Sequence, residues 1–103
     1  MHRSIRLLAM PALVLGMATT ALAQDAYAGR NLAATCANCH GTNGHARGDM
    51  KPLAGVSAEK IIAALADYKS GAQPSTIMGQ LAKGYSDAQI KAVAAFFAAQ
   101  PAK

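Results

Sequence analysis

The five residues Cys36-Ala37-Asn38-Cys39-His40 are the stretch of this sequence that decides its fold. Residues three apart on a helical turn project from the same face, so the two cysteines point the same way. The C-x-x-C-H pattern is the attachment sequence for c-type haem: the cysteines form thioethers to the porphyrin and the histidine binds the iron. We therefore predict one covalently bound haem c, held by Cys36 and Cys39, with His40 as an axial ligand.

Three other interpretations of the two cysteines stay open. A thioredoxin-like dithiol needs a neighbouring βαβ pattern, and no alternating strand pattern occurs here. A structural zinc site needs four Cys or His ligands; beyond residue 23 the sequence offers only Cys36, Cys39, His40 and His45, within ten residues. A disulfide across C-x-x-C would close a very short loop and constrain little. The haem interpretation is favoured over all three.

The second axial ligand has three candidates. Thioether sulfur stabilises ferrous iron and raises the potential, which suits electron transfer. His45 is only five residues from His40 and therefore lies on the same side of the ring. Met50 belongs to the glycine-rich stretch directly after His40, where we expect ordinary core packing. Met78 follows a full helix that can carry the chain around the ring, so Met78 is the predicted ligand.

The first 23 residues have the parts of a secretory signal peptide. Arg3 and Arg6 precede an apolar run over residues 7–18, and Ala21-Leu22-Ala23 supplies small residues at an A-x-A site. The run is shorter than the ~20 residues of a membrane-spanning helix. We predict cleavage after Ala23, a cytochrome domain over residues 24–103, a periplasmic location and no membrane span after cleavage. A retained N-terminal anchor is the alternative.

The remaining domain is small and only mildly charged. Removing 23 of the 103 residues leaves 80, and removing Arg3 and Arg6 leaves eight basic residues against five acids, a net charge of +3. Such a charge favours encounter with an acidic partner, but it is too weak and unclustered for nucleic acid. Much of the 52% hydrophobic content is alanine. A chain of this size with so thin a core needs a staple, which a porphyrin would supply.

The pattern of capping and apolar residues predicts an all-α fold. Ser57 is a predicted N-cap, Gly71 a predicted helix end, and Ser86 with Gln89 has the form of a capping box. Glycine and proline punctuate a long loop over residues 41–55. Three main helices and long loops are therefore expected around one haem. The predicted helices cover residues 25–37, 57–70, 79–83 and 86–100.

With these motifs in place, the sequence resembles a small bacterial class I cytochrome c across residues 25–100. The residues that carry the resemblance are Cys36 to Gly44, Pro52-Leu53-Ala54-Gly55, Met78 and a capped C-terminal helix ending in Phe96-Phe97. The resemblance implies that the N- and C-terminal helices cross, with Gly29 against Phe96 or Phe97. It also implies that the Pro52 carbonyl orients the His40 ring, and that Met78 is the distal ligand.

Loop residues are similar to those of a narrower group, the cytochrome subunit of flavocytochrome c sulfide dehydrogenase. The matching stretches are residues 68–71, 74–79 and 83–87. In that family a separate flavoprotein subunit oxidises sulfide and passes electrons to the haem. Some members carry two haems, whereas this sequence has one C-x-x-C-H. The resemblance implies redox protein partners, a flavoprotein subunit among them.

The predicted function is single-electron transfer by Fe(II)/Fe(III) cycling at a haem ligated by His40 and Met78. This makes the protein a carrier with no catalytic residues, not an enzyme. One alternative is an electron-accepting haem subunit of a sulfide dehydrogenase complex; a haem sensor with an open sixth position is less favoured. The basic side chains that are candidates for guiding an acidic partner, or for ordinary solvated surface, are Arg47, Lys51, Lys69 and Lys83.

Overall fold

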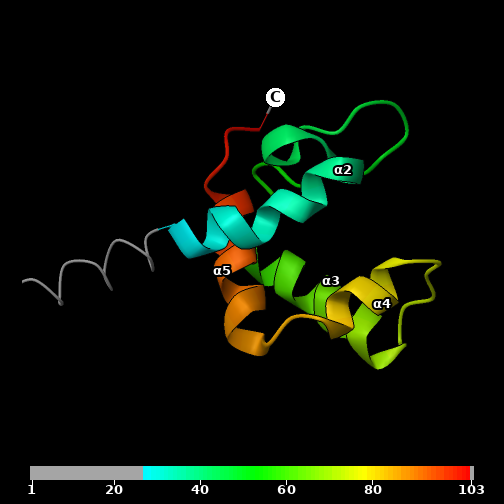
Figure 1. The fold of residues 1–103 in the computed structure, drawn as a ribbon. Helices are drawn as coiled ribbons and strands as arrows, with labels where there is room; N and C mark the ends of the chain where they lie inside the picture. Colours follow the sequence, from blue (N-terminus) through cyan, green and yellow to red (C-terminus); the bar gives the residue numbers. More distant parts are fainter. Residues whose placement is uncertain (1–26, 103) are drawn as a thin grey trace, which may run out of the picture.

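The computed structural model describes residues 27–102, so the predicted signal peptide lies outside the described part of the chain. Helices joined by loops make up residues 27–102, and no strand occurs among them (Figure 1). The helical elements are residues 27–33, η1 (Ala34–Cys36), α2 (Ala37–His40), η2 (Thr42–Gly44), α3 (Ala58–Ser70), α4 (Met78–Lys83) and α5 (Asp87–Ala98). The predicted all-α fold is confirmed.

Residues 27–40 are helical throughout and are called the N-terminal helical segment below. This segment crosses α5 (Figure 1). A Cβ atom placed on Gly29 would stand 2.5 Å from the backbone oxygen of Ala92 and 3.4 Å from Cβ of Phe96. Only a residue without a side chain lets the two helices approach this closely. The expected crossing is confirmed, with Phe96 rather than Phe97 beside Gly29.

The starts of α3 and α5 and the end of α3 lie at the residues that the sequence predicts, whereas α5 ends at Ala98, two residues before the predicted end. The Ser57 hydroxyl accepts a hydrogen bond from the N–H of Lys60 at the start of α3, and Gly71 ends α3 in the left-handed conformation. Ser86 and Gln89 form a reciprocal capping box at the start of α5. Both caps satisfy backbone N–H groups that have no partner inside the helix. α4 begins at Met78, one residue earlier than predicted.

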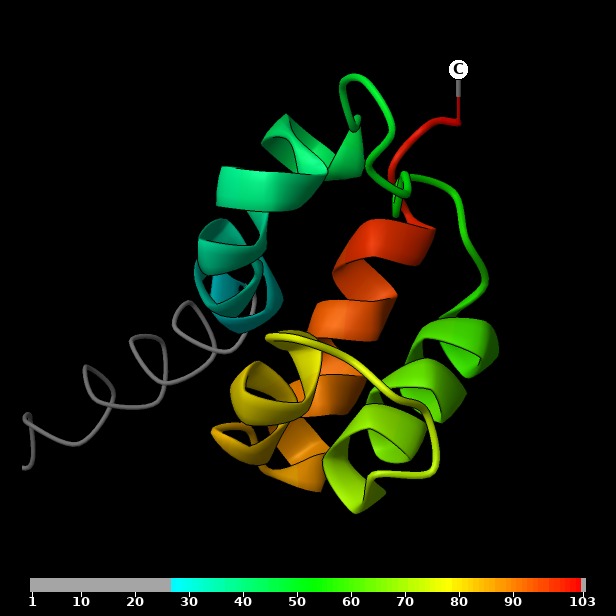
Figure 2. The same ribbon diagram turned by 90° about the vertical axis from the view of Figure 1, so that its right-hand side faces the viewer.

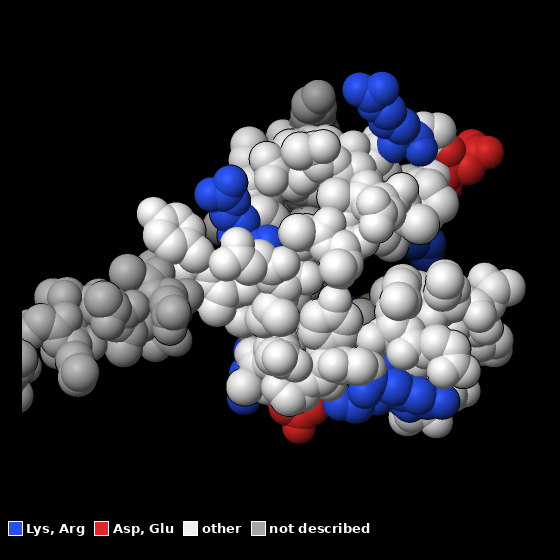
Figure 3. Space-filling model, in the orientation of Figure 1, with Lys and Arg blue, Asp and Glu red and all other residues white. Residues whose placement is uncertain are grey.

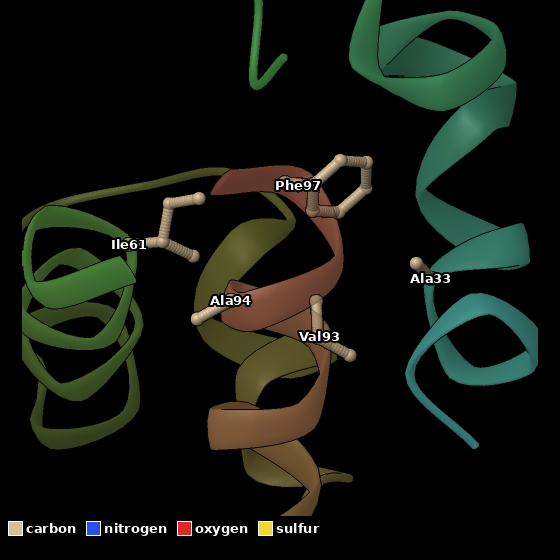
Figure 4. Close-up of a cluster of buried hydrophobic side chains, with 5 residues drawn as sticks. All are labelled: Ala33, Ile61, Val93, Ala94 and Phe97. Atoms are coloured by element: carbon tan, nitrogen blue, oxygen red, sulfur yellow. The ribbon is translucent and has the colours of Figure 1, made fainter. Parts of the chain in front are cut away.

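The core lies where α5 meets its two neighbours. In the turned view, α5 stands between the N-terminal helical segment and α3 (Figure 2). Figure 4 shows the buried cluster at this place: Ala33, Ile61, Val93, Ala94 and Phe97. Among the described residues, Phe97 is the only large side chain that is fully buried, with an exposed fraction of 2%. Half of the buried apolar residues are alanines, so the core is as thin as the composition predicts.

The loop after α2 is fastened to the end of α5. The N–H of Leu53 donates to the carbonyl of Gly44 at 2.9 Å, and the N–H of Gly55 donates to the carbonyl of Phe97 at 2.9 Å. These bonds hold the residues after His40 in a defined position. Within residues 27–102, no helix combines the length and the apolar character needed to cross a membrane.

Candidate functional site

The C-x-x-C-H residues lie on continuous helix. Cys36 is the last residue of η1, and Cys39 and His40 belong to α2. The two thiols are free; Cys36 is half-buried and Cys39 is exposed. A spacing of three along a helical turn places both on one side of the backbone, which is the arrangement that two bonds to one porphyrin edge require.

The Cys36 thiol sits beside Thr35. Burial raises the pKa of the Cys36 thiol above its ordinary value, while a hydrogen bond with the Thr35 side chain acts in the opposite direction. Burial has this effect because it disfavours the charged thiolate. The Cys36 side chain therefore stays protonated near neutral pH until a bond is made to it.

One hydrogen bond orients the ring of His40. Its Nδ1 lies 2.7 Å from the backbone oxygen of Lys51. A carbonyl oxygen can only accept, so Nδ1 carries the hydrogen, and Nε2 is left to bind a metal ion. Histidine ligands are usually held by such a bond from the nitrogen that does not bind the metal.

The expected orienting residue was wrong by one position, because the carbonyl is that of Lys51 and not of Pro52. A residue that precedes proline is confined to extended conformations, and successive carbonyls of an extended chain point to opposite sides. Only one of the two neighbouring carbonyls can therefore face the ring. Pro52 instead helps to line a surface depression of about 860 Å³ together with Cys39 and Arg47; neither His40 nor Met78 lines it.

Gly41 ends α2 directly after His40. Its φ is +83°, and a Cβ atom on it would meet the backbone of His45, so the turn requires glycine. His45 then donates from Nε2 to the carbonyl of Pro101 at 2.8 Å, which ties the loop to the end of the chain.

Met50 is 43% exposed. The expectation that Met50 packs in the core is therefore wrong.

The molecule is hollowed between the elements that carry His40 and Met78. Figure 1 shows α2, which ends at His40, on one side, and α3 with α4, which begins at Met78, on the other. The space-filling view in the same orientation shows an indentation between them (Figure 3). Met78 is half-buried. Two exposed apolar side chains are close to it in sequence: Ile77, the N-cap of α4, at 56%, and Leu81, within α4, at 47%.

These features fit a haem. Two free thiols three residues apart, a histidine with Nε2 available, a hollow and uncovered apolar side chains are the donor set and the surface that a porphyrin uses. The zinc alternative needs a group of His, Cys, Asp or Glu side chains close enough to bind one metal ion. Residues 27–102 contain no group of three or more such side chains. The strands that a thioredoxin-like site needs are likewise missing from that range.

Lys69, one of the four basic residues considered for guiding an acidic partner, makes contacts within this protein. Its Nζ donates to the backbone oxygen of Tyr85 at 2.7 Å and lies 4.0 Å from a carboxylate oxygen of Asp87. The Tyr85 hydroxyl in turn lies 2.7 Å from Oγ1 of Thr35. Sequence reasoning missed Thr35, Tyr85 and the Lys51 carbonyl, because contacts across 11 to 50 residues leave no local pattern.

Comparison with known proteins gives a consistent family. The sequence profile described as cytochrome c matches residues 26–100. The cytochrome subunit of sulfide dehydrogenase from Chlorobaculum tepidum is 42% identical over 69 residues, which cover 67% of this chain and 63% of that protein. This chain thus spans less than two thirds of the length of that relative.

A second relative matches this chain over nearly all of its own length, and a solved structure matches its fold. Cytochrome c-554(548) of Halomonas halodenitrificans is 34% identical over 82 residues, which cover 76% of this chain and 99% of that protein. The structure of cytochrome c4 from Acidithiobacillus ferrooxidans superposes with a TM-score of 0.61 at 32% identity, covering 76% of this chain and 48% of the other. The fold is that of a class I cytochrome c.

Proposed function

This chain belongs to the cytochrome c family, whose cofactor is covalently attached haem c, and from that premise we propose that it is an exported single-electron carrier with a His40- and Met78-ligated haem. The observation that carries the proposal is the orientation of His40. Its Nδ1–H is bound to the Lys51 carbonyl at 2.7 Å, and it follows two free thiols on the same helix.

The proposal gives each site residue a role. Cys36 and Cys39 form the two thioethers, and His40 binds the iron through Nε2. Met78, at the start of α4 across the hollow, supplies the sulfur ligand. The bound haem supplies a one-electron couple between ferrous and ferric iron. The polypeptide would hold the haem through these four side chains and exclude water from it.

Export is part of the proposal. Residues 1–23 are removed as a signal peptide, and residues 24–103 work in the periplasm as an electron carrier without a catalytic site of its own. The support is the arrangement of basic, apolar and small residues in that stretch. The mass of the mature protein tests it: the expected N-terminal residue is Gln24, and an uncleaved chain would contradict it.

The axial ligand is tested by Met78→Ala in protein matured with covalent haem. We expect loss of the weak far-red band of methionine–ferric ligation and tighter cyanide binding, because the sixth position opens. The reduction potential should fall by on the order of 0.1 V, within the ~0.8 V over which axial ligands set potentials. Absorption spectra and a redox titration measure both.

Met50→Ala is the matched control for Met78→Ala. Met50 is the other methionine of the mature chain, and its side chain is 43% exposed. The Met50 variant should keep the far-red band and the potential of the parent protein. If Met78→Ala keeps the far-red band, the sulfur ligand is not Met78; if Met50→Ala loses it, Met50 takes that role.

A second candidate function is a haem subunit that accepts electrons from a flavoprotein. The 42% identity to the cytochrome subunit of sulfide dehydrogenase favours it. Purification from the native host separates the two functions. A carrier runs as a monomer, whereas a subunit co-purifies with a flavin-containing chain and its haem is reduced when sulfide is added.

A further inference from the structure

We propose that Tyr85 is a positioning residue for the haem site: its hydroxyl fastens the segment after α4 to the helix that carries the two cysteines. The proposal rests on the His40 and Met78 ligation proposed above. Tyr85 has no part in the ligand set proposed above. The support for the proposal comes from one long-range hydrogen bond and the contacts that hold both of its ends.

The bond joins residues 50 positions apart. The Tyr85 hydroxyl lies 2.7 Å from Oγ1 of Thr35. The Thr35 hydroxyl is also within 3.4 Å of the carbonyl of Leu32, to which it can only donate. The Tyr85 hydroxyl lies within 3.5 Å of the same Leu32 carbonyl, so one hydroxyl donates to that carbonyl and accepts from the other, and either of the two can take that place. Both hydroxyl groups are thus satisfied in one short chain of bonds.

The Thr35 end lies beside the haem attachment residues. Thr35 directly precedes Cys36 in η1. The helix continues from there without a break to Cys39 and His40. A force applied at Thr35 therefore acts on the part of the chain that bears both thioethers and the histidine ligand.

The Tyr85 end is held from three sides. Its N–H donates to the carbonyl of Ala82, the last buried residue of α4, and its own carbonyl accepts from Nζ of Lys69 at 2.7 Å. The next residue, Ser86, is the N-cap of α5. Tyr85 is thereby coupled to α3 and α4, the helices on the Met78 side of the hollow, and to the start of α5.

The Tyr85–Thr35 bond is a second point of attachment for the N-terminal helical segment, at a distance from its crossing with α5. This bond is called the clasp below. The N-terminal helical segment meets α5 at Gly29, six residues and about 9 Å along the helix from Thr35. With the Gly29 crossing as one fixed point, the Tyr85–Thr35 bond restrains rotation of the segment about it. Without this bond, the halves that carry His40 and Met78 can separate more easily, and small ligands reach the iron more readily.

The test measures cyanide binding to the ferric, haem-loaded protein, because cyanide must displace Met78. Tyr85→Phe keeps the ring and removes only the hydroxyl. A net hydrogen bond of ordinary strength corresponds to about a two- to tenfold increase in the cyanide binding constant. Thr35→Val removes the other partner at nearly the same shape and should give an increase of similar size. The double variant should add little to either one.

Conservative and matched variants separate this role from a general loss of stability. Thr35→Ser keeps the hydroxyl and should behave as the parent protein. Tyr27→Phe removes a hydroxyl from a 56% exposed tyrosine on the same helical segment and should change nothing. Ser57→Ala removes the cap of α3 far from the clasp; it should lower the denaturation midpoint without raising cyanide affinity.

Each outcome decides the matter. Increased cyanide affinity in Tyr85→Phe and Thr35→Val, non-additive in the double variant, supports the clasp. Unchanged affinity in both, with the far-red band of the parent protein intact, overturns it and leaves the Met78 assignment standing. A parent protein without that band overturns the proposed ligation itself, so the two failures are distinguishable.

Discussion

At the scale of single residues, individual contacts fix the orientation of the His40 ring and the integrity of the core. The His40 ring is directed by one bond to the Lys51 carbonyl, and the Lys69 amine is drawn to the Tyr85 carbonyl. In the core, Phe97 is 2% exposed and packs edge-on to Phe96, with ring centres 5.3 Å apart. With so few large buried side chains, each one carries an unusual share of the packing.

At this scale we predict that Phe97→Ala is severely destabilising. Removal of a buried phenylalanine costs about 3–5 kcal/mol, against a total of about 5–15 kcal/mol for a typical domain. Denaturant unfolding of the haem-loaded protein, followed by circular dichroism, measures the loss. Tyr27→Ala is the control and should cost well under 1 kcal/mol, since Tyr27 is 56% exposed. Equal losses in the two variants would contradict the assignment of Phe97 to the core.

Between elements, the decisive contact is the crossing of the N-terminal helical segment with α5. Local signals place the individual helices: the caps at Ser57 and Ser86 and the stop at Gly71 are all where the sequence predicts. Those signals say nothing about which helices touch. The N-terminal helical segment can contact α5 because Gly29 has no side chain, so the backbone of Ala92 can lie close to it.

We predict that Gly29→Ala forces these two helices apart. The new Cβ would stand 2.5 Å from the Ala92 oxygen, and overpacking of this kind costs about 1–3 kcal/mol despite the better helix propensity of alanine. The change in denaturation midpoint measures it. Gly84→Ala is the control: its φ is −77° and its nearest neighbour would lie at 3.3 Å. A stabilised Gly29→Ala variant would show that the crossing is not tight.

On the scale of the whole molecule, the polypeptide has a thin core and a hollow beside it. Half of the buried apolar residues in the described part of the chain are alanines, while Ile77 and Leu81 stay about half exposed. The hydrophobic contribution to folding scales with the apolar area removed from water. A chain that leaves such side chains uncovered depends on its cofactor for a large part of its stability.

We accordingly predict that removing both attachment cysteines abolishes cooperative folding. The Cys36→Ala/Cys39→Ala double variant cannot form thioethers, so it should show low helicity and no cooperative thermal transition by circular dichroism. Met78→Ala is the control, because it keeps both thioethers and should still unfold cooperatively. A double variant that melts cooperatively at the temperature of the parent protein, without haem, would contradict the stapling role.

The sequence by itself determined what is local: the C-x-x-C-H motif, the helix caps at Ser57 and Ser86 and the stop at Gly71, the all-α class and the shortage of large apolar residues. Each of these depends on residues within about one or two helical turns, where spacing alone fixes direction. Tertiary structure alone decided that Lys51 and not Pro52 orients His40, that Met50 is exposed, that Phe96 meets Gly29, and that Tyr85 reaches Thr35. The physical reason is that these contacts depend on how separate segments are brought together, which no periodicity within one segment records.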